Sequence, residues 1–81
     1  MAAPRRAGSR PVTDLGSGET ATIAGIESHD PERLVKLSAL GLMRGVRVTL
    51  VQKLPAVVIR VAETTVALDR EVARDILVAL D

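Results

Sequence analysis

Residues 34–48 constrain the fold of this chain more than any other stretch. Gly41 follows a leucine-rich segment, and glycine commonly ends a helix because it adopts left-handed backbone at no steric cost. Beyond Gly45, apolar residues alternate with Arg47 and Thr49, which predicts a strand with one solvated face. The leucines before Gly41 are spaced to share one face of a short helix: Leu34, Leu37 and Leu40. A helix that ends on glycine and leads into a strand carries no catalytic group, so this stretch predicts a structural role.

The composition excludes several classes of binding site. The chain has no Phe, Tyr or Trp, so it can build neither a base-stacking platform for single strands nor an aromatic groove for proline-rich peptides. Its 11 basic and 10 acidic residues nearly cancel, and no broad positive field favours nucleic acid as a partner. The absence of cysteine excludes disulfides, thiolate metal sites and thiol nucleophiles.

The length of 81 residues leaves room for one domain. Residues 1–11 are rich in Ala, Pro, Arg, Gly and Ser and predict a disordered tail, so the domain is expected over residues 12–81. The N-terminus lacks the apolar region of a secretory signal, and the apolar runs fall far short of the roughly 20 residues needed to span a bilayer. We therefore expect a cytoplasmic protein that does not insert into the membrane.

Turn and capping residues delimit a mainly β chain with two short helices. Asp30 and Asp69 are typical helix N-caps, while Arg33 is expected to face water. Gly25 is expected to mark either a bulge or a sharp bend. Short connections between antiparallel strands favour a small, partly open β-barrel. Strands are predicted at residues 20–26, 46–50, 57–61, 64–68 and 77–80, and helices at residues 31–40 and 70–75.

Two runs of residues resemble the FeoA family of ferrous-iron transport proteins. That family has a leucine-rich helix, a Leu-Gly-Leu turn, a further glycine and a Val-x-Val strand, followed by a spaced aliphatic tail. The first run is matched by Leu40, Gly41, Leu42, Gly45, Val46 and Val48, and the second by Ala67, Leu68, Ala73, Ile76 and Val78.

The resemblance implies an SH3-like barrel without catalytic activity or cofactor. It also implies a partner, the membrane transporter for Fe²⁺ called FeoB, whose cytosolic portion includes a GTP-binding domain. The same fold occurs at the C-terminal end of some metal-dependent transcriptional repressors, so a regulatory or sensor module is the alternative. The chain departs from the family pattern at Arg44, where the family usually has proline, and at the connection 54–56, which is shorter than usual.

Few polar residues form a pattern that indicates chemistry. His29 is the single histidine, and with neighbouring carboxylates it is more typical of a solvated loop than of a metal site, which needs several preorganised ligands. Asp69 and Glu71 are explained by the preference of a helix N-terminus for negative charge. The serines have no assignable base beside them. We therefore predict neither a metal site nor an enzyme.

A protein-binding surface is the remaining candidate. Met43 and Arg44 are expected to be exposed, whereas Leu42 and Leu54 fit either a surface patch or the core. An open sheet edge would also allow two copies to associate by strand addition. The predicted partner-binding residues are Leu42, Met43, Arg44, Leu54 and Pro55, and the predicted structural turn residues are Gly41 and Gly45.

Overall fold

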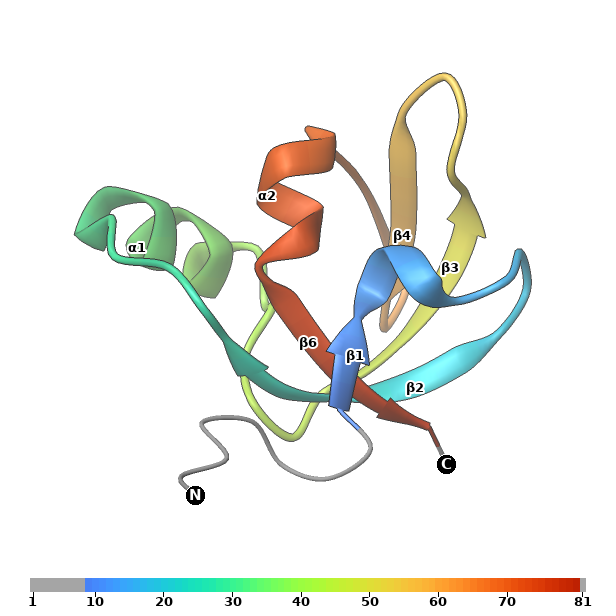
Figure 1. The fold of residues 1–81 in the computed structure, drawn as a ribbon, viewed down its shortest axis with the longest axis horizontal. Helices are drawn as coiled ribbons and strands as arrows, with labels where there is room; N and C mark the ends of the chain where they lie inside the picture. Colours follow the sequence, from blue (N-terminus) through green and yellow to red (C-terminus); the bar gives the residue numbers. More distant parts are fainter. Residues whose placement is uncertain (1–8, 81) are drawn as a thin grey trace.

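The computed structural model describes residues 9–80, in which six antiparallel strands form one open sheet with two helices beside it (Figure 1). The strand order is β1-β6-β2-β3-β4-β5, so β1 and β5 are the edges. The predicted mainly β class with two helices is confirmed. In chain order the elements are β1 (Ser9–Pro11), the 3-10 helix η1 (Val12–Asp14), β2 (Thr20–Ile26), α1 (Pro31–Ala39), β3 (Arg47–Gln52), β4 (Val57–Val61), β5 (Thr64–Leu68), α2 (Arg70–Arg74) and β6 (Ile76–Leu80).

The strand β1 corrects the predicted start of the domain. Ser9 pairs with Ala79 and Pro11 with Leu77, so these residues belong to the sheet and not to a tail. Proline is tolerated here because β1 is an edge strand. The remainder of the predicted tail, residues 1–8, lies outside the described residues.

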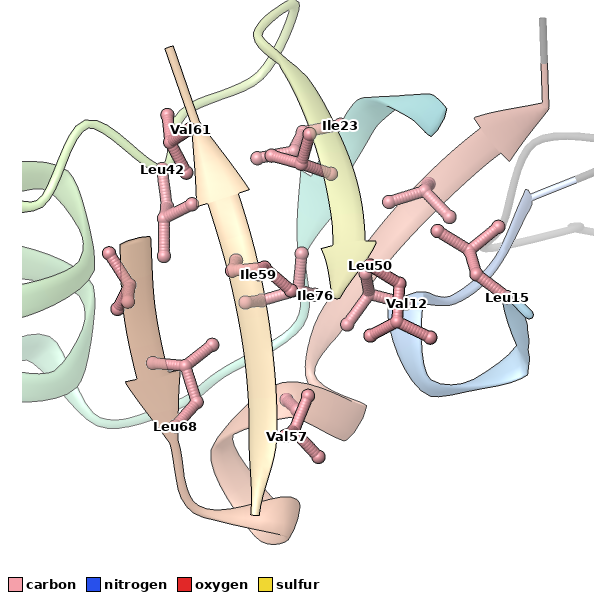
Figure 2. Packing of buried hydrophobic residues seen from close by; sticks show 14 of the residues in the cluster. Val12, Leu15, Ile23, Leu42, Leu50, Val57, Ile59, Val61, Leu68 and Ile76 are labelled. Atoms are coloured by element: carbon pink, nitrogen blue, oxygen red, sulfur yellow. The ribbon is translucent and has the colours of Figure 1, made fainter. Parts of the chain in front are cut away.

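The core is built from aliphatic side chains alone. The curved sheet surrounds them, with η1 and α1 closing two sides (Figure 2). Within residues 9–80 no polar or charged residue is buried. Each large aliphatic side chain contributes about 1.5–3 kcal/mol when fully buried, so this cluster is the main source of stability. The largest fully buried side chains are Ile23, Leu37, Leu42, Leu50, Ile59, Ile76, Val12, Val48, Val57 and Val78.

The C-terminus of α1 is closed by a Schellman motif. The amide of Gly41 donates to the carbonyl of Ser38 at 2.9 Å, and the amide of Leu42 donates to the carbonyl of Leu37 at 3.0 Å. Gly41 has a φ of +88°, the left-handed conformation that the sequence predicts. Leu37 and Leu42 are 1% and 0% exposed, so the motif joins helix and core.

The other leucines of α1 are less buried than their spacing predicts. Leu34 and Leu40 are each 39% exposed, and only Leu37 lies in the core. The helix therefore sits at the periphery of the molecule, as Figure 1 shows.

Small irregularities in the sheet match the sequence in part. The register between β2 and β6 shifts between Ile23 and Gly25, which favours the bulge over the sharp bend. A second shift, between Leu50 and Gln52 of β3, was not predicted. The last strand begins one residue earlier than predicted, because Ile76 is the first residue of β6.

Replacing Gly41 should destabilise the fold. Gly41→Ala is expected to lower the free energy of unfolding by about 1–2 kcal/mol, because alanine is strained at positive φ. The nearest atom to an added Cβ, Val61 Cγ1, lies at an ordinary 3.7 Å, so the cost is conformational. Gly25→Ala is the matched control, since its Cβ would meet nothing within 4 Å and its φ is not left-handed. Urea unfolding measures the stability of both variants. Equal losses of stability would contradict the conclusion that Gly41 is needed for its left-handed backbone.

The turn between β4 and β5 permits the opposite test. Val61 pairs with Thr64, so Ala62 and Glu63 form a two-residue turn, and Ala62 has a φ of +55°. Ala62→Gly is expected to raise the free energy of unfolding by roughly 0.5–1 kcal/mol, the relieved strain less the added chain entropy. A lower thermal midpoint in calorimetry would contradict this.

Candidate protein-interaction surfaces

Leu42 is a core residue and not part of a docking surface. Its side chain is completely buried, and it lies beside Val61 (Figure 2). The prediction that Leu42 contacts a partner is corrected by this burial, because the Schellman motif turns the side chain inward.

Met43 and Arg44 lie in an exposed connection with a defined backbone. Met43 is 48% exposed, and Arg44 is also exposed. Gly45, with a φ of +91°, donates its amide to the carbonyl of Ile23 at 2.8 Å. Ile23 in turn donates to the carbonyl of Val46 at 2.8 Å. These bonds attach the loop to β2, so Met43 is presented from a fixed backbone.

Leu54 and Pro55 lie at the tip of the β3–β4 hairpin. Leu54 is 72% exposed, which rules out its alternative assignment to the core. Arg70 Nη2 donates to the carbonyl of Lys53 at 3.0 Å, and Gln52 Nε2 to the carbonyl of Ala56 at 3.4 Å. The tip is therefore connected to α2.

The two exposed segments do not form one patch. Met43 and Arg44 precede β3, whereas Leu54 and Pro55 follow it, so the length of a six-residue strand separates them. At about 3.3 Å per residue this is roughly 20 Å. Figure 1 shows the loop before β3 and the hairpin tip at opposite ends of the molecule.

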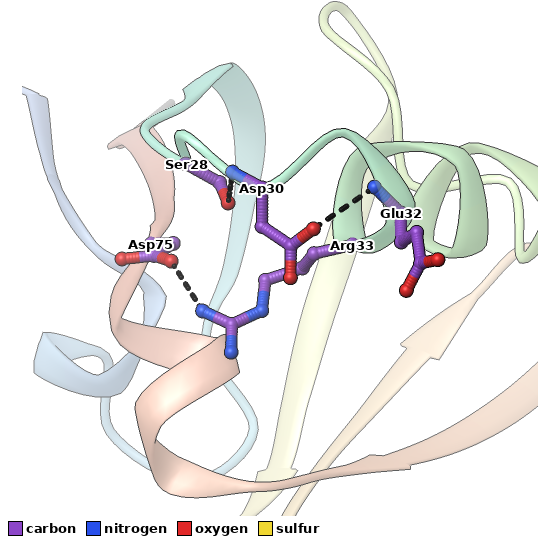
Figure 3. A network of polar contacts seen from close by, with 5 residues as sticks. All are labelled: Ser28, Asp30, Glu32, Arg33 and Asp75. Atoms are coloured by element: carbon purple, nitrogen blue, oxygen red, sulfur yellow. Dashed lines mark hydrogen bonds and ion pairs between the residues drawn. The ribbon is translucent and has the colours of Figure 1, made fainter.

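Polar contacts hold the N-terminal half of α1 (Figure 3). Asp30 Oδ1 accepts the amide of Glu32 at 3.0 Å, which confirms the predicted N-cap. Ser28 Oγ accepts the amide of Asp30 at 3.2 Å. Arg33, expected to face water, instead forms an ion pair with Asp75 at 3.0 Å, and both side chains are about one-third exposed, at 32% and 28%. This pair links α1 to the end of α2.

A groove lies between α1 and the end of β5, continuing to α2. Its volume is about 400 Å³, within the range of about 300–1,000 Å³ typical of ligand pockets. Sequence reasoning missed it, because three elements contribute to it and no local motif marks it. Its lining residues are Asp30, Glu32, Arg33, Lys36, Leu37, Leu40, Ala67, Leu68, Asp69 and Val72.

The acidic residues singled out in the sequence have different roles. Asp69 occupies the N-cap position of α2, but its side chain makes no capping hydrogen bond, so the capping explanation given for it is wrong in detail. Asp69 is one of the residues that line the groove. His29 is exposed, and residues 9–80 contain no group of three or more His, Asp or Glu that could hold a metal ion. No helix in this part of the chain is long and apolar enough to cross a membrane.

Comparison with known proteins identifies the family. The model of the FeoA domain matches residues 10–80, nearly the whole sequence. The chain belongs to the FeoA family. A search of the curated proteins gives no match to this FeoA-family chain.

Solved structures share its fold. T. acidophilum IdeR aligns with a TM-score of 0.87 and 22% identity, over 95% of this chain and 36% of that one. An iron uptake regulatory protein (FeoA) aligns with a TM-score of 0.77 and 20% identity, over 86% of this chain and 93% of that protein. A FeoA-like protein from Clostridium acetobutylicum gives a TM-score of 0.77 and 19% identity, over 93% of this chain and 90% of that protein. The chain thus spans about a third of IdeR and most of each FeoA protein.

The Arg33–Asp75 pair should affect α1 locally. We expect Arg33→Ala to lower the free energy of unfolding by less than about 1 kcal/mol, because exposed ion pairs contribute little. The amides of α1 should nevertheless exchange faster with solvent, since few contacts hold this helix. Lys36→Ala, at an exposed position of the same helix, is the control. Hydrogen exchange followed by NMR measures both, and unchanged exchange in Arg33→Ala would contradict the local role.

Proposed function

We propose that this chain is a non-catalytic cytoplasmic accessory protein of ferrous-iron uptake, which docks on the cytosolic part of a FeoB-type transporter. Membership of the FeoA family over residues 10–80 carries this proposal. Its sheet is then an SH3-like, partly open barrel that serves as a rigid scaffold. The protein alters the transporter by contacting one of its states more favourably than another.

The loop at Met43 and Arg44 supports a docking role. An exposed methionine adapts its shape to an apolar partner surface, and the neighbouring arginine adds a polar contact at the rim. Because the backbone of the loop is hydrogen-bonded to β2, little conformational entropy is lost when a partner binds. The hairpin tip at Leu54 and Pro55 is a second contact point, distant from the first.

A regulatory module of a metal-dependent repressor is the second candidate. The higher TM-score of IdeR, 0.87 against 0.77 for the FeoA protein, favours it. Such a sensor needs direct metal binding, so titration of the purified chain with Fe²⁺ and Mn²⁺ separates the two. We expect calorimetry to detect no stoichiometric binding of either metal, whereas tight binding would favour the sensor.

Substitution of Met43 tests the docking role. Met43→Asp is expected to weaken binding to the purified cytosolic part of a FeoB-type transporter by about tenfold, or roughly 1.4 kcal/mol, because a charge then replaces an apolar contact. Leu80→Asp is the matched control, because Leu80, at the end of β6, is also apolar and about as exposed as Met43. Surface plasmon resonance measures binding and circular dichroism checks the fold. Equal binding by both variants would remove Met43 from the contact, and no binding by the wild type would refute the proposal.

A further inference from the structure

The strand β5 carries none of the residues or irregularities that usually protect a sheet edge. β5 ends the strand order, and the segment Thr64–Leu68 contains no proline, no charged residue and no shift of register against β4. Within residues 9–80, the backbone of β5 makes no hydrogen bond outside its own ladder. Natural edge strands commonly carry a lysine, a proline or a bulge because an unprotected edge can pair with another strand. The free N–H and C=O groups of β5 are thus available to an added strand.

The groove beside this edge can take the side chains of an added strand. Helix α1 lies next to β5 (Figure 2), and the groove between them has a volume of about 400 Å³. Its apolar part comes from Leu37, Leu40, Leu68 and Val72. The groove is lined by Ala67 and Leu68 of β5. Because alternate side chains of a strand point the same way, side chains on one face of an added strand would enter the groove at this end of β5.

Charges around the edge favour a basic occupant. Glu63 and Asp69 flank β5 directly, and Asp30 and Glu32 lie on the helix side of the groove. Of the two cations that line the groove, Arg33 is paired with Asp75 and Lys36 is left. Near the edge itself, Arg70 donates to the carbonyl of Lys53, and Arg60 lies on β4 opposite Thr65, so the excess of carboxylates is local to the two ends of β5. Asp69 makes no capping bond, so its carboxylate is available to a basic side chain.

The same charges oppose pairing between two copies of β5. An antiparallel pair related by a two-fold axis and centred on Val66 places Glu63 of one copy opposite Asp69 of the other. Like charges directly opposite each other destabilise a ladder. A strand with Lys or Arg at its ends meets opposite charges at both flanks instead. The edge therefore fits a foreign basic strand better than a second copy.

We propose that the β5 edge and the groove beside α1 bind an extended segment of a partner protein as an added strand. The segment carries aliphatic side chains at alternate positions, which enter the groove, and Lys or Arg at its flanks, which face Glu63 and Asp69. This inference rests on the proposed function, in which the segment belongs to the cytosolic part of the transporter.

Peptides displayed from a random library test the proposal on the full-length chain. We expect the selected peptides to have alternating aliphatic residues and basic flanks, and to protect β5 amides from hydrogen exchange. The double variant Glu63→Lys, Asp69→Lys should bind them about tenfold more weakly. Asp14→Lys, at an exposed position in η1, is the matched control and should bind them normally.

Backbone methylation separates strand addition from ordinary apolar binding. N-methylation at alternate residues of a selected peptide removes the donors toward β5 while keeping every side chain. One of the two methylation patterns should abolish binding and the other should leave most of it. Equal binding of both methylated forms would overturn the proposal, as would protection confined to residues outside β5 and α1, or a library that yields no binder.

The transporter assay distinguishes this inference from the proposed function. If the cytosolic part of the transporter binds and the Glu63→Lys, Asp69→Lys variant binds it equally well, the strand-addition site is wrong and the proposed function stands. If selected peptides bind at β5 but the transporter does not bind the chain, the site stands and the assigned partner is wrong.

Discussion

The burial of Leu37 and Leu42 positions α1, and the surfaces of this protein depend on it. Leu37 is the one residue of α1 in the core, and the hydrogen bond between its carbonyl and the amide of Leu42 closes the helix there. The ion pair of Arg33 with Asp75 then fixes the other half of the helix with a weaker, solvent-screened contact. Helix α1 is therefore held strongly by its buried leucine and weakly by its ion pair. These two contacts together set the position of the helix beside β5, and with it the shape of the groove.

Features that depend on local backbone preference could be predicted from the sequence, whereas the tertiary contacts of side chains and strands could not. The turn at Gly41 follows from the conformational freedom of glycine, which is a local property. The register shift beside Gly25 was also predicted, although the φ of Gly25 is not left-handed. By contrast, Leu42 and Met43 are adjacent in sequence, yet one is buried and the other exposed. Which of them faces the core is set by the Schellman geometry. The strand β1 was missed because its pairing partner, β6, lies at the other end of the chain.

The groove was beyond sequence reasoning for a related reason. Asp69 looked like a helix cap because aspartate before a helix usually is one, but its side chain makes no such bond. Ala67 and Leu40 show no common pattern, since the fold alone brings β5 next to α1. A site assembled from three elements becomes visible only when the order of the strands and the position of the helix are known together.

Because no polar residue between Ser9 and Leu80 is buried, recognition by this part of the chain takes place at its surface. Apolar contacts give affinity but little orientation, whereas the hydrogen bonds of a strand edge fix both direction and register. The β5 edge supplies such bonds, and its flanking carboxylates add selectivity against strands of the wrong charge. Leu40 lines the groove and lies only three positions before Met43 in the sequence. A partner with an apolar surface and an adjoining basic strand could therefore contact both, and the linked contacts would reinforce each other without requiring either to be strong alone.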